Sequence, residues 1–229
     1  MLCYEGTSVG QTPGGRRFKS GPRDTLYILK MRGTPLLIVF EGIDFSGKRT
    51  QAELLAEYLK SKGYSISLYS FPDYTTTTGK ILEEYLTMKR NLDSRIVAML
   101  YAINRLEKLK EIEKDIEENK IIIFDRYIYS NMAYQMANGL DLEWLRMLDI
   151  YMPRPDLVIF LKISPEEALK RKGECDRYEK LEFLRKVERI YEKMANGEIK
   201  TNVKWYIVDG SKSIGEIHKK VVEIVEKFL

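Results

Sequence analysis

The chain has 229 residues, of which 44% are hydrophobic and 31% are charged. This balance is typical of one globular domain with a sizeable core, and it excludes a chain that is disordered throughout. The longest apolar runs, such as residues 36–40, are far shorter than the roughly 18 residues of a membrane span, and no secretory signal follows Met1. We therefore expect a cytoplasmic protein that does not enter a membrane.

The cysteine and histidine content and the net charge argue against several kinds of site and partner. Cys3 and Cys175 fit neither a zinc site nor a disulfide framework, and the sole histidine, His218, lies in a charged segment that predicts a solvated helix. The net charge is +4, but residues 1–30 hold five basic and two acidic residues, so the remainder is nearly neutral. This distribution gives no reason to expect a nucleic-acid partner.

The first 33 residues differ from the rest of the chain. They are rich in Gly, Pro, Ser and Arg and have no hydrophobic period, so they predict a flexible extension. Met31 stands just before the first predicted strand, which leaves two interpretations open: a native start at Met31, or a tail with a role of its own. Residues 34–229 are predicted to form the folded domain.

From residue 36 onward, strand and helix patterns alternate. In chain order, they predict a strand at 36–41, a helix at 50–62, a strand at 64–70, helices at 81–88 and 95–119, and a strand at 121–125. Helices at 131–137 and 142–152, a strand at 156–162, helices from 165 and at 181–195, a strand at 204–209 and a helix at 214–228 follow. This order predicts an α/β fold, a five-stranded parallel sheet with helices on both faces. Ligands of such folds bind beyond the carboxyl ends of the strands.

A candidate phosphate loop follows the first strand. In FEGIDFSGKRT (residues 40–50), Gly42, Gly47 and Lys48 have the Gly-x4-Gly-Lys spacing. Glycines let backbone N–H groups face phosphate oxygens, and the helix N-terminus adds its positive dipole end. The alternative is a structural turn between strand and helix. Arg49 replaces the Ser or Thr hydroxyl that normally holds magnesium, so it either swings outward or grips the phosphates itself.

Two other stretches carry candidate ligands. Asp125 and Arg126 end the third predicted strand, where the carboxylate can hold magnesium through water and the guanidinium can grip a phosphate. The alternative for this pair is an ion pair that caps a helix. In YAINR, Tyr101 and Arg105 lie one helical turn apart and can stack on a base and read its edge. The alternative for Tyr101 is a place in the core.

These motifs together resemble the thymidylate kinase family of P-loop nucleoside monophosphate kinases. The resemblance runs from residue 36 to the C-terminus and rests on FEGIDFSGK, FPD with a following TGK, YAINR, DRYIYSN, PRPDLVIFLK and VDGSKSI. It implies transfer of the ATP γ-phosphoryl group to dTMP, which gives dTDP and ADP for dTTP synthesis. It also implies Mg²⁺ as cofactor, and a homodimer.

The resemblance implies roles at the donor site. Lys48 and the loop amides hold the ATP phosphates, and Asp125 assists the metal. A lid at about residues 170–179 supplies Arg171, Lys172 and Arg177 as cations, the alternative being a solvated charged face. The implied ATP-binding residues are Gly42, Asp44, Phe45, Ser46, Gly47, Lys48, Arg49, Thr50, Lys172, Gly210 and Ser211.

The resemblance also implies roles at the acceptor site. Asp44 faces the sugar 3′-hydroxyl, and Arg126 grips the acceptor phosphate. Tyr101 stacks on thymine and Arg105 bonds its O4, while Tyr127 packs beneath the sugar and excludes a 2′-hydroxyl. The other implied pocket residues are Phe71, Pro72, Asn131 and Tyr134.

Three positions depart from the family pattern and keep alternatives open. Phe45 stands where some members have an arginine, so the lid has to supply that charge. Tyr74 stands where eukaryote-like members have a phosphate-binding arginine, which leaves open a kinase for another small nucleotide or nucleoside. Arg49 leaves open a non-catalytic nucleotide-binding protein. A GTPase switch has little support, because the chain has no Asn-Lys-x-Asp sequence.

Overall fold

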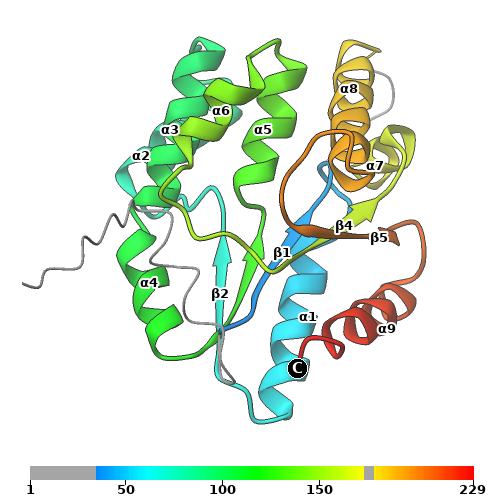
Figure 1. Ribbon diagram of the computed structural model, residues 1–229. Helices are drawn as coiled ribbons and strands as arrows, with labels where there is room; N and C mark the ends of the chain where they lie inside the picture. Colours follow the sequence, from blue (N-terminus) through cyan, green and yellow to red (C-terminus); the bar gives the residue numbers. More distant parts are fainter. Residues whose placement is uncertain (1–34, 173–177) are drawn as a thin grey trace, which may run out of the picture. The chain divides into compact units, whose positions relative to one another are not determined.

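The computed structural model describes residues 35–172 and 178–229, and residues 35–229 form one compact unit (Figure 1). The predicted N-terminal extension, and Arg177 of the predicted lid, lie outside the described residues. Predictions about them therefore stay predictions. No described helix is long and apolar enough to cross a membrane.

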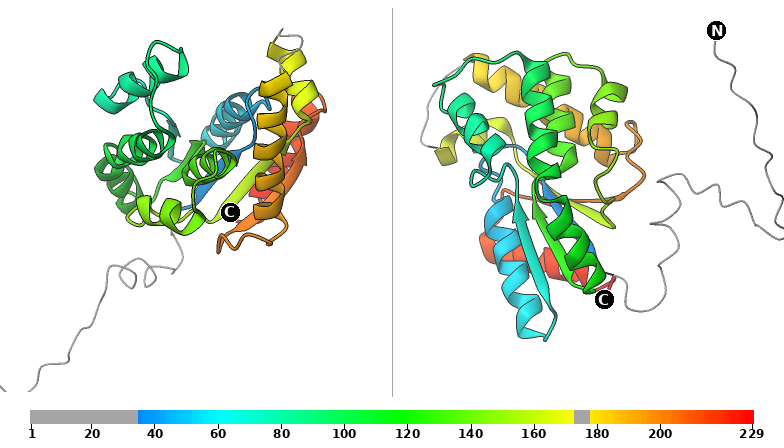
Figure 2. Two further views of the ribbon diagram at one scale, coloured as in Figure 1. Left: turned by 90° about the horizontal axis from the view of Figure 1, so that it is seen from above. Right: turned by 90° about the vertical axis from the view of Figure 1, so that its left-hand side faces the viewer.

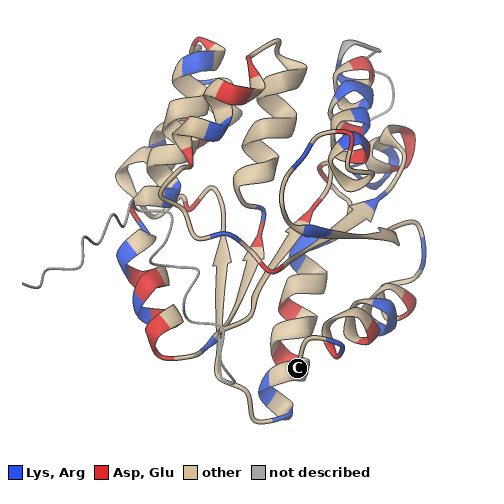
Figure 3. Ribbon diagram, viewed as in Figure 1, with Lys and Arg blue, Asp and Glu red and all other residues tan. Residues whose placement is uncertain are grey.

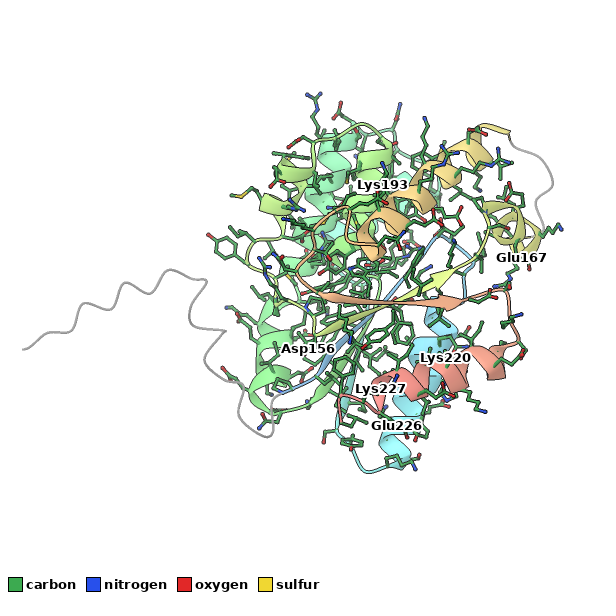
Figure 4. The ribbon with its side chains drawn as sticks, turned by 45° about the vertical axis from the view of Figure 1, so that its right-hand side comes forward. Asp156, Glu167, Lys193, Lys220, Glu226 and Lys227 are labelled. Carbon is green, nitrogen blue, oxygen red and sulfur yellow. The ribbon has the colours of Figure 1, made fainter. Side chains whose placement is uncertain are left out.

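A parallel sheet of five strands runs through the domain in the order β2-β3-β1-β4-β5. This confirms the predicted fold class. The strands are β1 (Leu37–Glu41), β2 (Ile66–Ser70), β3 (Ile121–Asp125), β4 (Leu157–Lys162) and β5 (Lys204–Asp209). The central strand β1 is buried over its whole length, which is why it has no polar alternation. At its start, Asp156 (labelled in Figure 4) accepts a hydrogen bond from the Leu37 amide at 3.0 Å.

Helices cover both faces of the sheet (Figure 1). Ile38 and Phe40 of β1 pack toward α1 and α9, whereas Leu37 and Val39 pack toward the opposite layer, which includes α3, α5 and α8. The helices are α1 (Lys48–Ser61), α2 (Thr77–Leu86), α3 (Ser94–Leu106), α4 (Leu109–Glu117), α5 (Ile128–Ala137), α6 (Leu142–Leu148), α7 (Pro165–Lys172), α8 (Tyr178–Ala195) and α9 (Ile214–Val225).

The prediction of one helix over residues 95–119 is wrong. The chain turns at residues 107–108, so that α3 and α4 are separate helices. The Glu107 carboxylate accepts a 2.5 Å hydrogen bond from the Thr78 hydroxyl, and Lys108 pairs with Asp73 at 3.4 Å. Asp73 belongs to the loop after β2 and Thr78 to the first turn of α2, and neither glycine nor proline marks the break. The helical period of apolar residues therefore runs on through residues 107–108, although tertiary contacts hold a turn there.

Several helix limits also differ from the predicted ones. α1 begins at Lys48 instead of residue 50, α5 at Ile128 instead of 131, and α2 at Thr77 instead of 81. The start of α2 is fixed by the Thr76 hydroxyl, which accepts a hydrogen bond from the Gly79 amide at 3.0 Å. α6 ends at Leu148 instead of residue 152, and the next residue, Asp149, turns inward.

Candidate active site

The phosphate loop joins β1 to α1 at the carboxyl edge of the sheet. Gly42 has a φ of 147°, and a Cβ there would lie 2.6 Å from the Leu161 carbonyl oxygen, so only glycine fits. Gly47 has a φ of 90° and precedes α1 without a side-chain cap. Because no side chain caps this helix, its first amides can bind an anion.

Lys48 lies buried inside the loop. Its Nζ donates to the Ile43 carbonyl oxygen at 2.7 Å and to Ser46 Oγ at 3.3 Å. Burial, together with the positive charge of Arg126, lowers the pKa of Lys48 to about 7 despite nearby carboxylates. The phosphates of a nucleotide would raise this pKa again, so the bound anion and the ammonium charge stabilise each other.

Arg126 lies directly after β3 and reaches back to the phosphate loop. Its Nη1 donates to the Gly42 carbonyl oxygen at 3.2 Å and to Ser130 Oγ at 3.1 Å, and its Nη2 pairs with Asp44. Burial works to raise the pKa of Asp44, but the charges of Arg126 and Lys48 outweigh burial and lower it. The structure thus brings Asp44, Lys48 and Arg126 together as one charged cluster.

Glu41 supports this cluster, and sequence reasoning missed it. Its buried carboxylate accepts hydrogen bonds from the backbone amides of Tyr127 at 2.9 Å and Ser130 at 3.1 Å. Since α5 has no cap from its own N-cap residue, a carboxylate from β1 caps that helix. A lone acidic residue that ends an apolar strand was the available signal.

A cavity of about 1140 Å³ opens beside this cluster. Its lining comes from the α2, α3 and α5 side of the domain and from the α7 and α8 side, which are seen apart in Figure 2. Asp44, Tyr74, Lys172 and Lys180 contribute to it. All the predicted acceptor-site residues line it: Phe71, Pro72, Tyr101, Arg105, Arg126, Tyr127, Asn131 and Tyr134.

Arg105 is held rigidly at the buried end of α3. Its Nε and Nη2 donate to the two carboxylate oxygens of Asp149, each at 2.8 Å, and both side chains are at most 2% exposed. This bidentate pair leaves Nη1 as a donor toward the cavity. Asp149 is a second residue that sequence reasoning missed, because it lies 44 positions away.

Tyr127 and Asn131 meet the cavity in different ways. The Tyr127 ring is fully buried and stacks on Phe124 at 4.3 Å, and its hydroxyl donates to the Pro153 carbonyl oxygen at 2.9 Å. Its hydroxyl is therefore occupied, and Tyr127 is among the residues that line the cavity. Asn131 Nδ2 donates to the Ala98 carbonyl oxygen at 3.1 Å, whereas Asn131 Oδ1 is buried without a partner. That oxygen can accept a hydrogen bond from a ligand.

The other predicted donor-site residues lie around the loop. Arg171 donates through Nη1 to the Phe45 carbonyl oxygen at 3.3 Å and through Nη2 to the Gly210 carbonyl oxygen at 2.9 Å. Its Nε contacts Glu167 of α7 at 3.2 Å (labelled in Figure 4). Lys172 lies 5.9 Å from the centre of the Phe45 ring. Ser211, by contrast, bonds Asp209 through its hydroxyl at 2.6 Å.

Arg49 takes the outward of its two predicted arrangements. Its exposed side chain pairs with Glu53 one turn along α1, at 2.8 Å, and does not cover the loop. Thr50 is exposed as well. Asp125 is the other residue expected near a metal: its Oδ2 accepts a hydrogen bond from Ser70 Oγ at 3.2 Å, and its Oδ1 is buried without a hydrogen-bond partner among the described residues. An unpartnered carboxylate oxygen at this edge fits a water ligand of Mg²⁺.

Comparison with known proteins shows the family of this chain. The family model described as thymidylate kinase matches residues 40–221. The chain belongs to the thymidylate kinase family. It is 38% identical to the thymidylate kinase of Arabidopsis thaliana over 226 residues, which cover 98% of this chain and 82% of that protein. It is 40% identical to a probable thymidylate kinase of Pyrococcus horikoshii over 206 residues, 86% of this chain and 97% of that protein.

A solved thymidylate kinase also shares the fold. The structure of the Candida albicans thymidylate kinase matches with a TM-score of 0.69 and 32% identity, over 85% of this chain and 92% of that one. The family resemblance found in the motifs is thus confirmed. Thymidylate kinases are phosphotransferases, so the phosphate loop, the charged cluster and the cavity belong to an enzyme.

Proposed function

We propose that this protein transfers the γ-phosphoryl group of ATP to dTMP and releases dTDP and ADP. The observation that carries this proposal is the cavity beside the phosphate loop. Arg105 and Asn131, the candidate base site, line the same cavity as Arg126 and Asp44, which supports the proposal. A nucleoside monophosphate laid between them would present its phosphate to the donor loop.

The polar groups of the cavity favour thymine over cytosine. Arg105 Nη1 can only donate, and Asn131 Oδ1 accepts. Thymine presents O4 as an acceptor and N3–H as a donor, which matches this pair, whereas cytosine presents a donor at the first position and an acceptor at the second. Each mismatch would leave a buried polar group unpaired. The Tyr101 ring supplies a stacking surface in the same cavity.

The transfer step requires positioning and charge more than a base. The acceptor oxygen is already anionic, so the protein has to bring two anions together and stabilise charge on the transferring group. Arg126 holds the acceptor phosphate and Lys48 the donor phosphates, while Arg171 steadies the loop through the Phe45 carbonyl. Mg²⁺, held through Asp125, would neutralise charge between the donor phosphates.

The direct test is to identify the products. Incubation with ATP, Mg²⁺ and dTMP, followed by anion-exchange separation, is expected to yield dTDP and ADP in equal amounts. Tight ATP binding without dTDP would instead support the non-catalytic alternative that Arg49 left open. ADP release without any phosphorylated acceptor would show hydrolysis, and it would contradict the proposed acceptor.

Arg49 is expected to raise the magnesium requirement without abolishing activity. Since its side chain points outward, Arg49→Ser should add a metal ligand and lower the Mg²⁺ concentration for half-maximal rate. The gain in the free energy of Mg²⁺ binding should be roughly 1–3 kcal/mol, the range for one charge-assisted contact. Arg49→Ala is the control, because it removes the cation without adding a hydroxyl. A serine variant that needs as much Mg²⁺ as the parent would contradict this account.

We also propose a homodimer and no nucleic-acid or membrane partner. Ile96, Met99, Ile103 and Leu106 are exposed on one face of α3, which is an apolar stripe that a second copy can cover. On α4, α8 and α9, basic and acidic residues alternate instead of forming one basic face (Figure 3). A cytoplasmic location stays a prediction from the sequence.

A further inference from the structure

Tyr191 of α8 contacts the residues that support the charged cluster. Its ring is fully buried and stacks on Phe160 at 5.4 Å between ring centres. Its hydroxyl oxygen lies 2.9 Å from Glu41 Oε2 and 2.9 Å from Ser130 Oγ. These partners are 150 and 61 positions away in the sequence, and none of the predicted roles involves Tyr191.

The hydrogens of this network can be assigned by counting donors. Ser130 has one hydroxyl hydrogen, and the 2.6 Å contact to Glu41 Oε2 takes it. Ser130 Oγ is therefore the acceptor for Arg126 Nη1 at 3.1 Å. Tyr191 donates its own hydrogen to Glu41 Oε2. The carboxylate then accepts four hydrogen bonds, two from amides and two from hydroxyls.

We propose that Tyr191 is a positioning residue for Arg126, acting through Glu41 and Ser130. The inference rests on the proposed function, in which Arg126 holds the acceptor phosphate. Without the tyrosine hydroxyl, Glu41 Oε2 keeps only the serine as partner inside a buried site. The two amides still hold Oε1, but the serine alone then holds Oε2, so the Ser130 hydroxyl is less firmly oriented. Arg126 depends on that serine oxygen for one of its contacts, so its guanidinium loses part of its preorganisation.

The Tyr191 hydroxyl should affect how the acceptor phosphate is bound, and not how the base is bound. Tyr191 contacts neither Arg105 nor Asn131 through any hydrogen bond in the described part of the chain. Its removal should therefore weaken the binding of an acceptor that carries a phosphate and spare one that does not. If the tyrosine hydroxyl merely stabilised the core, its removal would weaken the binding of both acceptors equally. The comparison of dTMP with thymidine thus distinguishes positioning from general support.

The experiment measures binding of dTMP and of thymidine by calorimetry, to the parent and to Tyr191→Phe. Phenylalanine keeps the ring and its stacking on Phe160. We expect the Kd for dTMP to rise roughly 3- to 10-fold, the range for losing one hydrogen bond, and the Kd for thymidine to stay within twofold. In an Arg126→Ala background, Tyr191→Phe should cause no further loss of dTMP binding.

Tyr69→Phe is the matched control. Tyr69→Phe also removes one hydroxyl hydrogen bond, which Tyr69 of β2 donates to Asp115 of α4 at 2.6 Å, and this bond is not part of the network of Glu41 and Ser130. Three results would each overturn the inference alone. They are equal dTMP affinity of the parent and Tyr191→Phe, an equal loss of affinity for thymidine and dTMP, and the same loss of dTMP affinity when Tyr191→Phe is added to Arg126→Ala. If the parent binds dTMP no better than thymidine, the assigned role of Arg126 fails first, and the inference fails with it.

Discussion

Replacing Lys48 with alanine is expected to lower kcat by at least about 100-fold, because a fixed charge aimed at the transferring group is lost. Lys48 is buried in the loop, where its Nζ contacts the Ile43 carbonyl oxygen at 2.7 Å. The fold should survive, since alanine favours helix and the change removes a buried cation whose pKa burial has already lowered to about 7.

The measurement is ADP release at saturating ATP and dTMP, with a thermal melt of each protein. Lys60→Ala is the control, because Lys60 is an exposed lysine on the same helix. It should leave both kcat and the melting temperature unchanged. A Lys48→Ala enzyme with kcat within tenfold of the parent would show that the loop lysine does not stabilise the transferring phosphoryl group.

Asp149→Ala is expected to destabilise the protein by about 3–5 kcal/mol, the range for leaving one member of a buried ion pair without its partner. The side chains of Arg105 and Asp149 are at most 2% exposed and make two hydrogen bonds of 2.8 Å. Replacing both residues with leucine should recover most of this stability, since no unpaired charge remains. The double variant should nevertheless lose discrimination between dTMP and dCMP, because Nη1 of Arg105 is gone.

Urea unfolding gives the stabilities, and initial rates with dTMP and dCMP give the discrimination. Glu223→Ala breaks an exposed pair with Lys220 and serves as control, with an expected change below about 0.5 kcal/mol. A stable Asp149→Ala protein, or a double-leucine protein that still rejects dCMP, would refute the role given to this pair.

The contrast between these residues shows what a sequence can reveal. Lys48 and Arg126 lie in short motifs that follow apolar strands, so local pattern and chain direction put them at one edge of the sheet. Asp149, Glu41 and Tyr191 matter through partners 44 to 150 positions away. No local period encodes such pairings. The turn at residues 107–108 escaped prediction for the same reason, because contacts from Thr78 and Asp73 hold it.

Arg49 shows a further limit. Its type and position predict the loss of a metal ligand, and that loss follows from the chain itself. Which way its side chain turns depends on Glu53 one turn later, and the 2.8 Å pair between them directs it to solvent. The sequence contains this i, i+4 pair, but an exposed pair is worth only a few tenths of a kcal/mol. Phosphate contact therefore remained an equal alternative until the structure was known.

Whether the cavity accepts dTMP is best tested with a panel of four nucleotide acceptors. The measurement is kcat/KM for dTMP, dUMP, UMP and dCMP at saturating ATP and Mg²⁺, with ADP release as the assay signal. We predict dTMP as the best acceptor, dUMP weaker and UMP weaker still, because the buried Tyr127 ring crowds a 2′-hydroxyl. We expect dCMP to be rejected by the donor and acceptor placed at Arg105 and Asn131. UMP or dCMP used as well as dTMP, or no phosphoryl transfer to any of the four, would contradict the account.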